Sequence, residues 1–585
     1  MKKRLIIFTF FFLLMFLYIP GSYYPLVQEK YFLYLFYGLI LLLLAIKKRV
    51  KIDITLMSIF LLFIPINYFF LKDAPWFRFE STINTVGFIL ASYFIFLFFN
   101  TVKNKEIFFK PLLLVFFIEK ILFLMQKAGF FVLGNLSGRN ALTGSLGNAN
   151  LCAFIFVISI SFSLFLYNKK EKIVNRYILV SDIVISIACI IISLSRSGII
   201  GMFFLILLST FMKVRDKKKK AYVIFSCILL TYLMFDRFHI NDSILQRIFI
   251  WKVSFKMFLE NPLLGVGLGN FKNAFFEYYS RVIRLQYLDF LPENTFAMHS
   301  HNDYLQLLSE FGSLLLIPII FSLKKQKKIL KFLKEPIVYS FFIIAFFDFP
   351  FHNPVVSFFF LAVLAIQITD DRIQMTEEEL QTTNYEPQPT QEQKVENRKK
   401  EVGNQNSQFP TPNSQLKRLF QLILVIFISF ASILSFKEFS SYYFLSKYLF
   451  KKQDIEYLNR SISFYENPEA RYFRSIEYYE KGNVDKSIED LSYSLTNTYE
   501  LPPYLFAIDL FTEFGYRDKA LEYGNKAYKL NPYDIRILKR LEFLYEKLEY
   551  IDKTEKIRKK IDSVLRHRNT RRKHGILEIL FEKER

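Results

Sequence analysis

Long apolar segments recur from the start of the chain to about residue 368, and short polar segments separate them. About 20 apolar residues in a helix cross the hydrocarbon core of a bilayer. Thirteen segments are candidate spans, at residues 5–19, 31–46, 54–71, 82–99, 107–125, 149–167, 177–195, 197–212, 221–236, 303–323, 336–348, 354–368 and 419–436. The pattern predicts an all-α, polytopic membrane helix bundle of about 12–13 spans, with residues 1–369 as its main domain. The apolar segment at the N-terminus resembles a signal peptide, but no small-residue cleavage site follows it, so we interpret it as a retained span.

Charge sets the expected orientation of this bundle. The 585-residue chain carries a formal net charge of +23, which in a soluble protein would suggest nucleic acid as a partner. Much of the excess instead lies in short loops such as residues 47–49, 213–220 and 324–328. Short Lys/Arg-rich loops face the cytoplasm. We therefore expect membrane lipids and no nucleic acid as partners, and we predict that the large loop 237–302 is extracytoplasmic.

The composition changes after the main bundle. Residues 370–418 are rich in Gln, Glu, Asn and Pro and poor in aromatic residues, which predicts a disordered linker. The apolar segment 419–436 is then an additional transmembrane helix, which places residues 437–585 outside the cytoplasm. If 419–436 were a peripheral helix, this tail would stay in the cytoplasm.

The tail contains an internal repeat. Asp485-Lys486, Asp518-Lys519 and Asp552-Lys553 recur at spacings of 33 and 34 residues, and Gly482 and Gly515 stand three residues before the first two pairs. Such a period with Gly between two helices resembles tetratricopeptide repeats, and a plain helical bundle is the alternative. Stacked repeats of this kind usually bind peptides or proteins, so we expect a protein partner here.

Two of the six histidines lie in "MHSHNDYLQLLSEFG", residues 298–312. Ser300 and Asp303 fit a capping box, which would place His301 at the first position of a helix, where the helix dipole favours a neutral imidazole. A neutral imidazole can accept a proton near pH 7, so His301 and His299 are candidate catalytic bases. Glu310 would lie in or near the hydrocarbon, where an ionisable side chain is a functional candidate by default. As an alternative, the histidines only form hydrogen bonds at the interface.

Two arginines strengthen the catalytic interpretation. Arg196 lies in a very short outward-facing hairpin, where its charge opposes the usual loop bias, and Arg247 lies on an amphipathic segment of the large loop. A topological anchor for Arg196 and a lipid headgroup contact for Arg247 are the alternatives. Asn148 and Asn150 open another span from the same side, and Asn302 and Asp303 are supporting polar residues. Glu119 and Lys120 are interpreted as a packing pair, and Asp182 as a polar helix contact, within the spans.

The expected chemistry follows from these residue types. Guanidinium groups bind phosphate oxygens with paired hydrogen bonds and stabilise developing negative charge, while a neutral base activates a hydroxyl. The three cysteines lie in apolar segments and form no cluster with histidine, so no metal site and no cofactor are expected. "GVGLGNF", residues 265–271, has the wrong spacing for a dinucleotide fingerprint.

The motifs "GNAN", "SLSRSG", "RIFIWKVSFKMFLENPLLGVGLGNF" and "HSHNDYLQLLSEFG" occur in this order among membrane spans. Over roughly residues 140–325 the chain thus resembles the O-antigen ligase/polymerase superfamily of bacterial membrane glycosyltransferases. The resemblance implies inverting, metal-independent transfer of a glycan from a polyprenyl-diphosphate carrier, at the outer face of the bacterial cytoplasmic (inner) membrane. By motif position it implies that Arg196 and Arg247 bind the diphosphate and that His301 is the base, with His299 as its neighbour or as the base itself.

The acceptor is left open by the resemblance. Lipid A core, a growing polysaccharide and Ser/Thr residues of proteins are the acceptors of ligases, polymerases and protein O-oligosaccharyltransferases in this superfamily. Outside the enzymes, a transporter or flippase for lipid-linked glycans is the main alternative, and a membrane-anchored assembly scaffold is another. The expected concentration of polar residues on one side of the bundle favours the enzyme.

Overall fold

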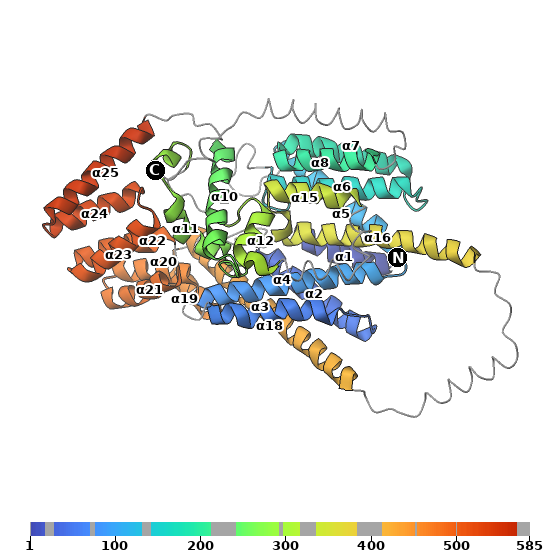
Figure 1. Cartoon of the computed structure of the whole chain (residues 1–585), viewed down its shortest axis with the longest axis horizontal. Coiled ribbons are helices and arrows are strands. Elements are labelled where there is room, and N and C mark those ends of the chain that lie inside the picture. Colours follow the sequence, from blue (N-terminus) through green and yellow to red (C-terminus); the bar gives the residue numbers. More distant parts are fainter. Residues whose placement is uncertain are drawn as a thin grey trace.

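The computed structural model describes residues 2–17, 28–70, 76–130, 142–211, 242–291, 297–315, 335–382, 412–450, 453–498 and 500–569. Within these ranges all regular secondary structure is helical (Figure 1). This confirms the all-α fold class. The predicted span 221–236 lies outside the described residues.

The apolar segments form the membrane part of the fold. Its helices are α1 (Lys2–Phe16), α2 (Gln28–Lys47), α3 (Ile54–Phe70), α4 (Trp76–Thr101), α5 (Glu106–Lys127), α6 (Ala149–Asn168), α7 (Arg176–Ser193), α8 (Arg196–Phe211), α15 (Pro336–Phe347), α16 (Pro354–Thr382) and α18 (Pro412–Phe450). Among the described residues, five of these helices (α2, α4, α6, α7 and α18) contain segments long and apolar enough to cross a membrane. The chain is therefore a multi-pass membrane protein.

Aromatic packing holds this bundle together. The Phe11 ring of α1 lies 5.9 Å from the rings of both Phe358 and Phe359 of α16. Phe99 of α4 and Phe108 of α5 are 5.0 Å apart in an edge-to-face arrangement. Lipid tails are as apolar as these side chains, so the hydrophobic effect does not drive helices together in a bilayer. Close van der Waals packing between the rings stabilises their association instead.

A buried ion pair also joins the membrane helices. Lys120 of α5 pairs with Asp182 of α7, and Asp182 Oδ2 accepts hydrogen bonds from Ser159 and Ser163 of α6, each at 2.8 Å. Both charged residues are almost fully buried. Each charge is satisfied by a partner inside the bundle. The contacts are packing contacts, as predicted, but the predicted pairing of Lys120 with Glu119 is wrong: Lys120 pairs with Asp182, and Glu119 accepts the backbone N–H of Ser145.

The predicted span 303–323 is wrong at its beginning. Residues Asp303–Phe311 form a separate short helix, α12, which ends at Gly312 with a φ of 63°. A 3-10 turn, η3 (Gly312–Leu315), follows. The α12 helix packs against α10 (Asp242–Glu260) in the large loop. Glu310 is thus buried in protein and does not lie in a helix that crosses the hydrocarbon.

The large loop also contains α11 (Phe271–Val282) and the 3-10 helix η2 (Leu285–Asp289). Helices α10, α11 and α12 lie between the membrane helices and the C-terminal helices (Figure 1). Another 3-10 turn, η4 (Pro350–His352), joins α15 to α16. The helices α16 and α18 extend into both ends of the predicted linker 370–418, and residues 383–411 lie outside the described part of the chain.

The tail consists of α19 (Ile455–Phe464), α20 (Pro468–Glu480), α21 (Val484–Asn497), α22 (Leu501–Glu513), α23 (Arg517–Leu530), α24 (Ile535–Lys547) and α25 (Ile551–Asn569). From α20 onward it is a series of three helix pairs. At the turn inside each pair, Gly482, Gly515 and Glu549 occupy equivalent positions with φ of 75°, 74° and 57°. A left-handed turn explains the recurring glycine.

The recurring lysine has a structural cause as well. Lys486, Lys519 and Lys553 each lie over an aromatic ring of the preceding helix, at 5.6 Å from Tyr478, 5.3 Å from Phe511 and 5.5 Å from Tyr545. These rings recur with the same spacing as the lysines. A cation–π contact therefore closes each helix pair. Assignment to the tetratricopeptide class remains a prediction.

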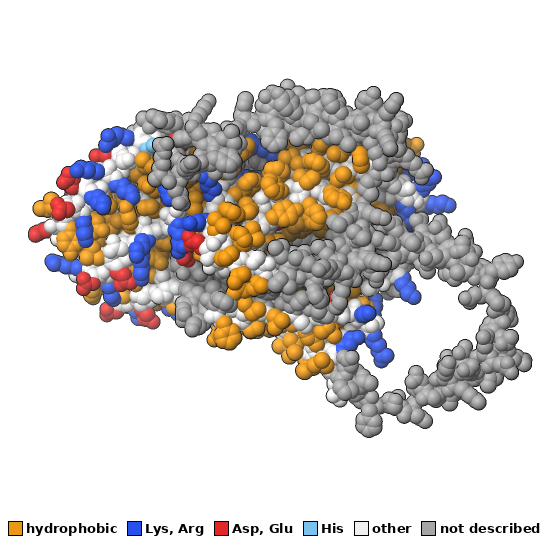
Figure 2. Space-filling model, in the orientation of Figure 1, with side chains coloured by type: hydrophobic (Ala, Val, Ile, Leu, Met, Phe, Trp, Pro, Cys, Tyr) orange, Lys and Arg blue, Asp and Glu red, His pale blue; other side chains and the backbone are white. Residues whose placement is uncertain are grey.

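The large loop and the tail share one hydrophobic core. Phe249 and Tyr279 of the loop belong to the same buried cluster as Phe511 and Leu541 of the tail. At its edge, His567 Nε2 of α25 lies 3.0 Å from Asp289 Oδ1 of η2. Charged side chains are frequent over the tail, whereas apolar side chains cover the visible membrane helices (Figure 2). The loop and the tail must therefore lie on the same side of the membrane.

This shared core gives a prediction about topology. In spheroplasts, Arg281→Cys in α11 and Lys559→Cys in α25 should both react with a membrane-impermeant maleimide, because both positions are exposed and both segments are predicted to be extracytoplasmic. The parent protein is the control for its own three cysteines, of which Cys152 and Cys189 are buried, and the Cys227→Ser background removes the third. Labelling of both variants only after the cells are lysed would reverse the predicted orientation, and labelling of only one would contradict the shared core.

Candidate active site

A buried carboxylate, Asp348, is the centre of the candidate site. It follows the last residue of α15 and its side chain is only 1% exposed. Its Oδ2 accepts hydrogen bonds from Asn150 Nδ2 at 2.9 Å and from Ser197 Oγ at 3.0 Å. Its Oδ1 lies 3.4 Å from His301 Nδ1. One side chain therefore connects α6, α8 and the segment before α12.

Arg247 of α10 contacts the same carboxylate. Its Nη1 donates a hydrogen bond of 2.6 Å to the carbonyl oxygen of Phe347, and its Nη2 lies 3.7 Å from Asp348 Oδ2. The Arg247 side chain remains 26% exposed. Arg196, the first residue of α8, is also partly exposed and lies near enough to Arg247 for the two positive charges to repel each other. The site thus holds two accessible cations beside one buried anion.

The backbone at His301 differs from the sequence prediction. His301 lies two residues before α12, with a left-handed φ of 51°. The N-cap is Asn302, whose Oδ1 accepts the backbone N–H of Leu305 at 3.0 Å, so Ser300 does not form the predicted capping box. The Nε1 of Trp251 donates to the carbonyl oxygen of His301 at 3.4 Å. The backbone turn and Asp348, not the first turn of a helix, therefore set the position of the imidazole.

The surroundings of Asp348 keep it ionised. Burial alone would raise its pKa, but the hydrogen bond to His301, the charge of Arg247 and the Ser197 hydroxyl outweigh burial and lower the pKa below its ordinary value. An ionised carboxylate beside Nδ1 favours the tautomer that carries its proton there. The other ring nitrogen, Nε2, is then the proton acceptor.

A second pair lies next to the first. His352 Nδ1 is 2.5 Å from Oδ1 of the buried Asp303, and the His352 ring centre is 5.3 Å from that of His299. Burial lowers the pKa of His352, but the Asp303 carboxylate outweighs burial and raises it above its ordinary value. Burial holds the pKa of His299 well below its ordinary value, and the charges of His352 and His301 lower it further. His299 also stacks on Phe349 at 4.4 Å.

The glycine-rich segment 265–271 packs against the C-terminal part of α12. The backbone N–H of Gly269 donates to Glu310 Oε2 at 2.8 Å, and Val266 N–H donates to the carbonyl oxygen of Ser309 at 2.8 Å. A Cβ on Gly265 would come within 2.3 Å of that same carbonyl oxygen. The glycines thus permit close backbone approach. Glu310 thus joins α12 to this segment, and its supporting role in the site stays a prediction.

The structure brings most predicted site residues together. Asn150, Arg247 and His301 meet at Asp348, Arg196 lies near Arg247, and His299 and Asp303 are linked through His352. Asn148 is the exposed N-cap of α6, and Asn302 is the N-cap of α12.

Sequence reasoning missed three residues of the site: Asp348, His352 and Ser197. Asp348 and His352 belong to "DFPFHNP", residues 348–354, at the junction of the apolar segments 336–348 and 354–368. An ionisable residue directly beside an apolar span was an available signal. Ser197 carried no signal beyond its place next to Arg196.

A family model described as O-antigen ligase matches residues 183–320. The match includes Arg196, Arg247, His299, His301, Asp303 and Glu310, and it ends before Asp348. It supports the superfamily resemblance and, with it, a ligase acting on glycans in a membrane. No curated protein matches the chain significantly.

Proposed function

We propose that this protein transfers a glycan from a polyprenyl-diphosphate carrier to an acceptor hydroxyl, with inversion at the anomeric carbon. The observation that carries the proposal is the group formed by Arg247, His301 and Asp348, with Arg196 beside it, in a segment that matches the O-antigen ligase model. These residues supply a base, an orienting carboxylate and two cations. That set is what transfer from a diphosphate leaving group requires.

In the proposed reaction, His301 Nε2 removes the proton of the acceptor hydroxyl as its oxygen attacks the anomeric carbon. The new carbon–oxygen bond forms while the bond from the anomeric carbon to the diphosphate oxygen breaks, and the electron pair leaves with the diphosphate. The imidazolium that forms is stabilised by Asp348 through Nδ1. His299 is less suited to this role, because its surroundings disfavour the protonated ring.

Arg196 and Arg247 are proposed to hold the diphosphate and to stabilise the charge that develops on it. Both guanidinium groups are partly exposed, and their mutual repulsion makes an anion between them favourable. This arrangement replaces the role that a metal ion takes in other diphosphate enzymes, so no metal is part of the proposal.

The site is proposed to face the extracytoplasmic side of the bacterial inner membrane. The predicted orientation of the large loop and the packing of that loop on the tail support this placement. A lipid-borne donor suits that side, because nucleotide-activated sugars are not expected there. The tail, proposed to be a tetratricopeptide-like domain, then faces the same compartment and can bind a protein partner of the assembly machinery.

The acceptor can be identified by glycan analysis of a deletion strain. We expect one of three defects: loss of long chains from lipopolysaccharide, accumulation of single repeat units, or loss of glycans from proteins. These identify lipid A core, growing polysaccharide and protein as the acceptor, respectively. Loss of surface glycans together with donor retained on the cytoplasmic side would instead indicate a flippase.

Arg247→Ala is expected to lower the transfer rate by about 10²–10³-fold, the typical cost of removing one group that stabilises developing charge. Arg247→Lys should recover only part of the rate, because an ammonium keeps the charge but not the paired hydrogen bonds. Transfer would be measured in membrane vesicles supplied with lipid-linked glycan. Arg281→Ala is the matched control, since Arg281 lies in the same loop and pairs with Glu260 and Glu277 at the surface. Full activity of Arg247→Ala would show that Arg247 does not stabilise the diphosphate.

A further inference from the structure

A second polar site lies where the membrane helices meet the tail. In α18, residues 419–436 carry no charge, and Lys437 is the first charged residue after them. Eighteen helical residues span about 27 Å, close to the thickness of the hydrocarbon core. On the neighbouring α4, Glu80 directly precedes the uncharged stretch 81–102. Lys437 and Glu80 therefore mark the depth at which hydrocarbon gives way to lipid headgroups.

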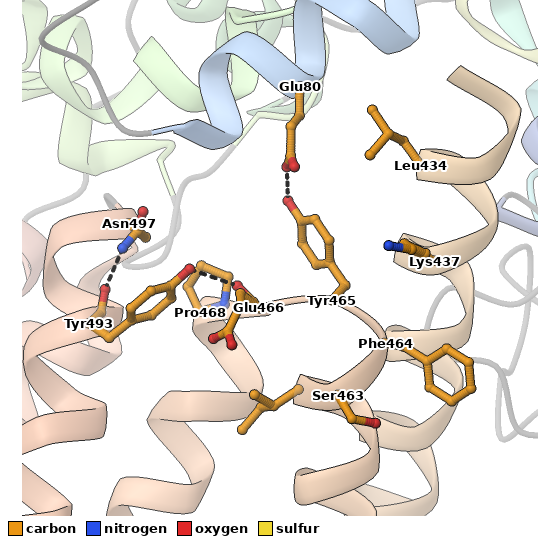
Figure 3. Close-up of a pocket in the computed structure, with 11 residues that line it drawn as sticks. Glu80, Leu434, Lys437, Ser463, Phe464, Tyr465, Glu466, Pro468, Tyr493 and Asn497 are labelled. Carbon is orange, nitrogen blue, oxygen red and sulfur yellow. Dashed lines mark hydrogen bonds between the residues drawn. The ribbon is translucent and has the colours of Figure 1, made fainter. Parts of the chain in front are cut away.

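A cavity of about 370 Å³ opens at this depth. Glu80 of α4, Leu434 and Lys437 of α18, and Tyr465 and Glu466 at the junction of α19 and α20 line it, and α21 completes the wall (Figure 3). The hydroxyl of Tyr465 donates to Glu80 Oε2 across the cavity. The cavity thus joins two membrane helices to the first helices of the tail.

Side chains of both charges line the cavity, and the positive and negative groups lie on different sides of it. Lys437 lies on one side of the Tyr465 ring and Glu466 on the other (Figure 3). Lys437 is exposed, and the part of the chain that the structure describes provides it with no hydrogen bond or ion pair. Glu466 is 54% exposed and uses one oxygen, Oε2, to bind Arg471. A purely anionic ligand would meet repulsion from Glu80 and Glu466.

An apolar face of α18 leads to the cavity. Phe430, Ile433 and Phe436 are 45%, 54% and 44% exposed, in a stretch that the hydropathy places in the bilayer. Leu434 then lines the cavity itself. A ligand with an apolar body along α18 and a polar head in the cavity would match both surfaces.

We propose that this cavity binds the headgroup of a zwitterionic aminophospholipid of the phosphoethanolamine type. Its phosphate pairs with Lys437, its ammonium faces Glu466 and the Tyr465 ring, and its acyl chains lie along the exposed face of α18. The bound lipid would fix the tail, and with it the large loop, relative to the membrane. The proposal does not depend on the reaction at Asp348.

The test uses the full chain in detergent micelles with added phospholipid, and it measures the midpoint of thermal unfolding against the lipid fraction. Phosphatidylethanolamine should raise the midpoint more than phosphatidylcholine, whose quaternary ammonium donates no hydrogen bonds, and more than phosphatidylglycerol, which lacks the cation. Lys437→Ala and Glu466→Gln should each weaken the apparent affinity for phosphatidylethanolamine about tenfold. Lys447→Ala is the matched control, because Lys447 lies on the same helix over the ring of Tyr443.

Equal effects of the three lipids, or an unchanged lipid response in both cavity variants, would overturn the proposal. Stabilisation by soluble oligosaccharide that is lost in Lys437→Ala would also overturn it and would identify a glycan site. If Lys437→Ala does not fold, Glu466→Gln decides, since it changes a half-exposed carboxylate to an amide of the same shape. Transfer activity is not the readout, so failure here leaves the proposed function untouched.

Discussion

His301→Ala is expected to lower the rate of glycan transfer by about 10²–10⁴-fold, the range that a positioned general base contributes. Its Nδ1 lies 3.4 Å from a buried carboxylate that would hold the ring in one tautomer. The side chain is 32% exposed, so a hydroxyl of the acceptor can reach its other nitrogen. Alanine removes the ring without leaving a large buried void, and the level of folded protein should stay near that of the wild type.

The measurement is transfer from lipid-linked glycan in membrane vesicles, normalised to folded protein. His299→Ala is the informative control, because His299 stacks on Phe349 and lies beside His352 instead of Asp348. We expect it to lower transfer far less than His301→Ala. The reverse order, with His301→Ala active and His299→Ala inactive, would transfer the role of base to His299.

Asp348→Asn is expected to lower the transfer rate by at least about 100-fold. An amide keeps the shape of the side chain but removes the charge that stabilises an imidazolium, and the equivalent change in a Ser-His-Asp triad costs about 10⁴-fold. It also leaves Arg247 without its anion. Because the effect acts through His301, it should appear mainly in kcat and should change the pH dependence of the rate.

Asp303→Asn is the matched control for this variant, since Asp303 is equally buried but pairs with His352. Unfolding against pH gives a second readout. The lowered pKa of Asp348 means that its contribution to stability is fully present above the unfolded value of about 4 and is lost as the pH falls through the folded pKa. The stability of the Asp348→Asn variant should lack this acid-dependent contribution. A variant that retains wild-type transfer would show that Asp348 only supports the fold.

Local features of the sequence determined the membrane helices and the helix pairs of the tail. In a bilayer, uncharged apolar stretches such as 149–167 and 177–195 can hydrogen-bond all their backbone N–H and C=O groups only as helices. The structure places α6 and α7 there. The spacing of Gly482 and Gly515 likewise located two turns, because a left-handed backbone favours glycine.

The same local reasoning failed at residues 303–315, the described part of the predicted span 303–323. Hydropathy continues through this segment, yet Gly312 ends α12 after nine residues, and Ser313 N–H donates to the carbonyl oxygen of Pro262 at 2.8 Å. That contact comes from a segment about 50 residues earlier, which no pattern inside the window reveals. The capping prediction at Ser300 failed for a local reason: Ser300 Oγ donates to the carbonyl oxygen of Asn302, and the side chain of Asn302 caps α12 instead.

By itself, the sequence determined the apolar helices of the bundle, and it indicated which residue types, two arginines and two histidines, are available for chemistry. Only the tertiary structure decided that they share a centre, because Asp348 collects Asn150, Ser197, Arg247 and His301 from segments as much as 198 residues apart. The tertiary structure also placed the tail on the loop that carries Arg247. Periodicity reports the environment of a helix face, whereas the meeting of distant side chains depends on how the helices pack.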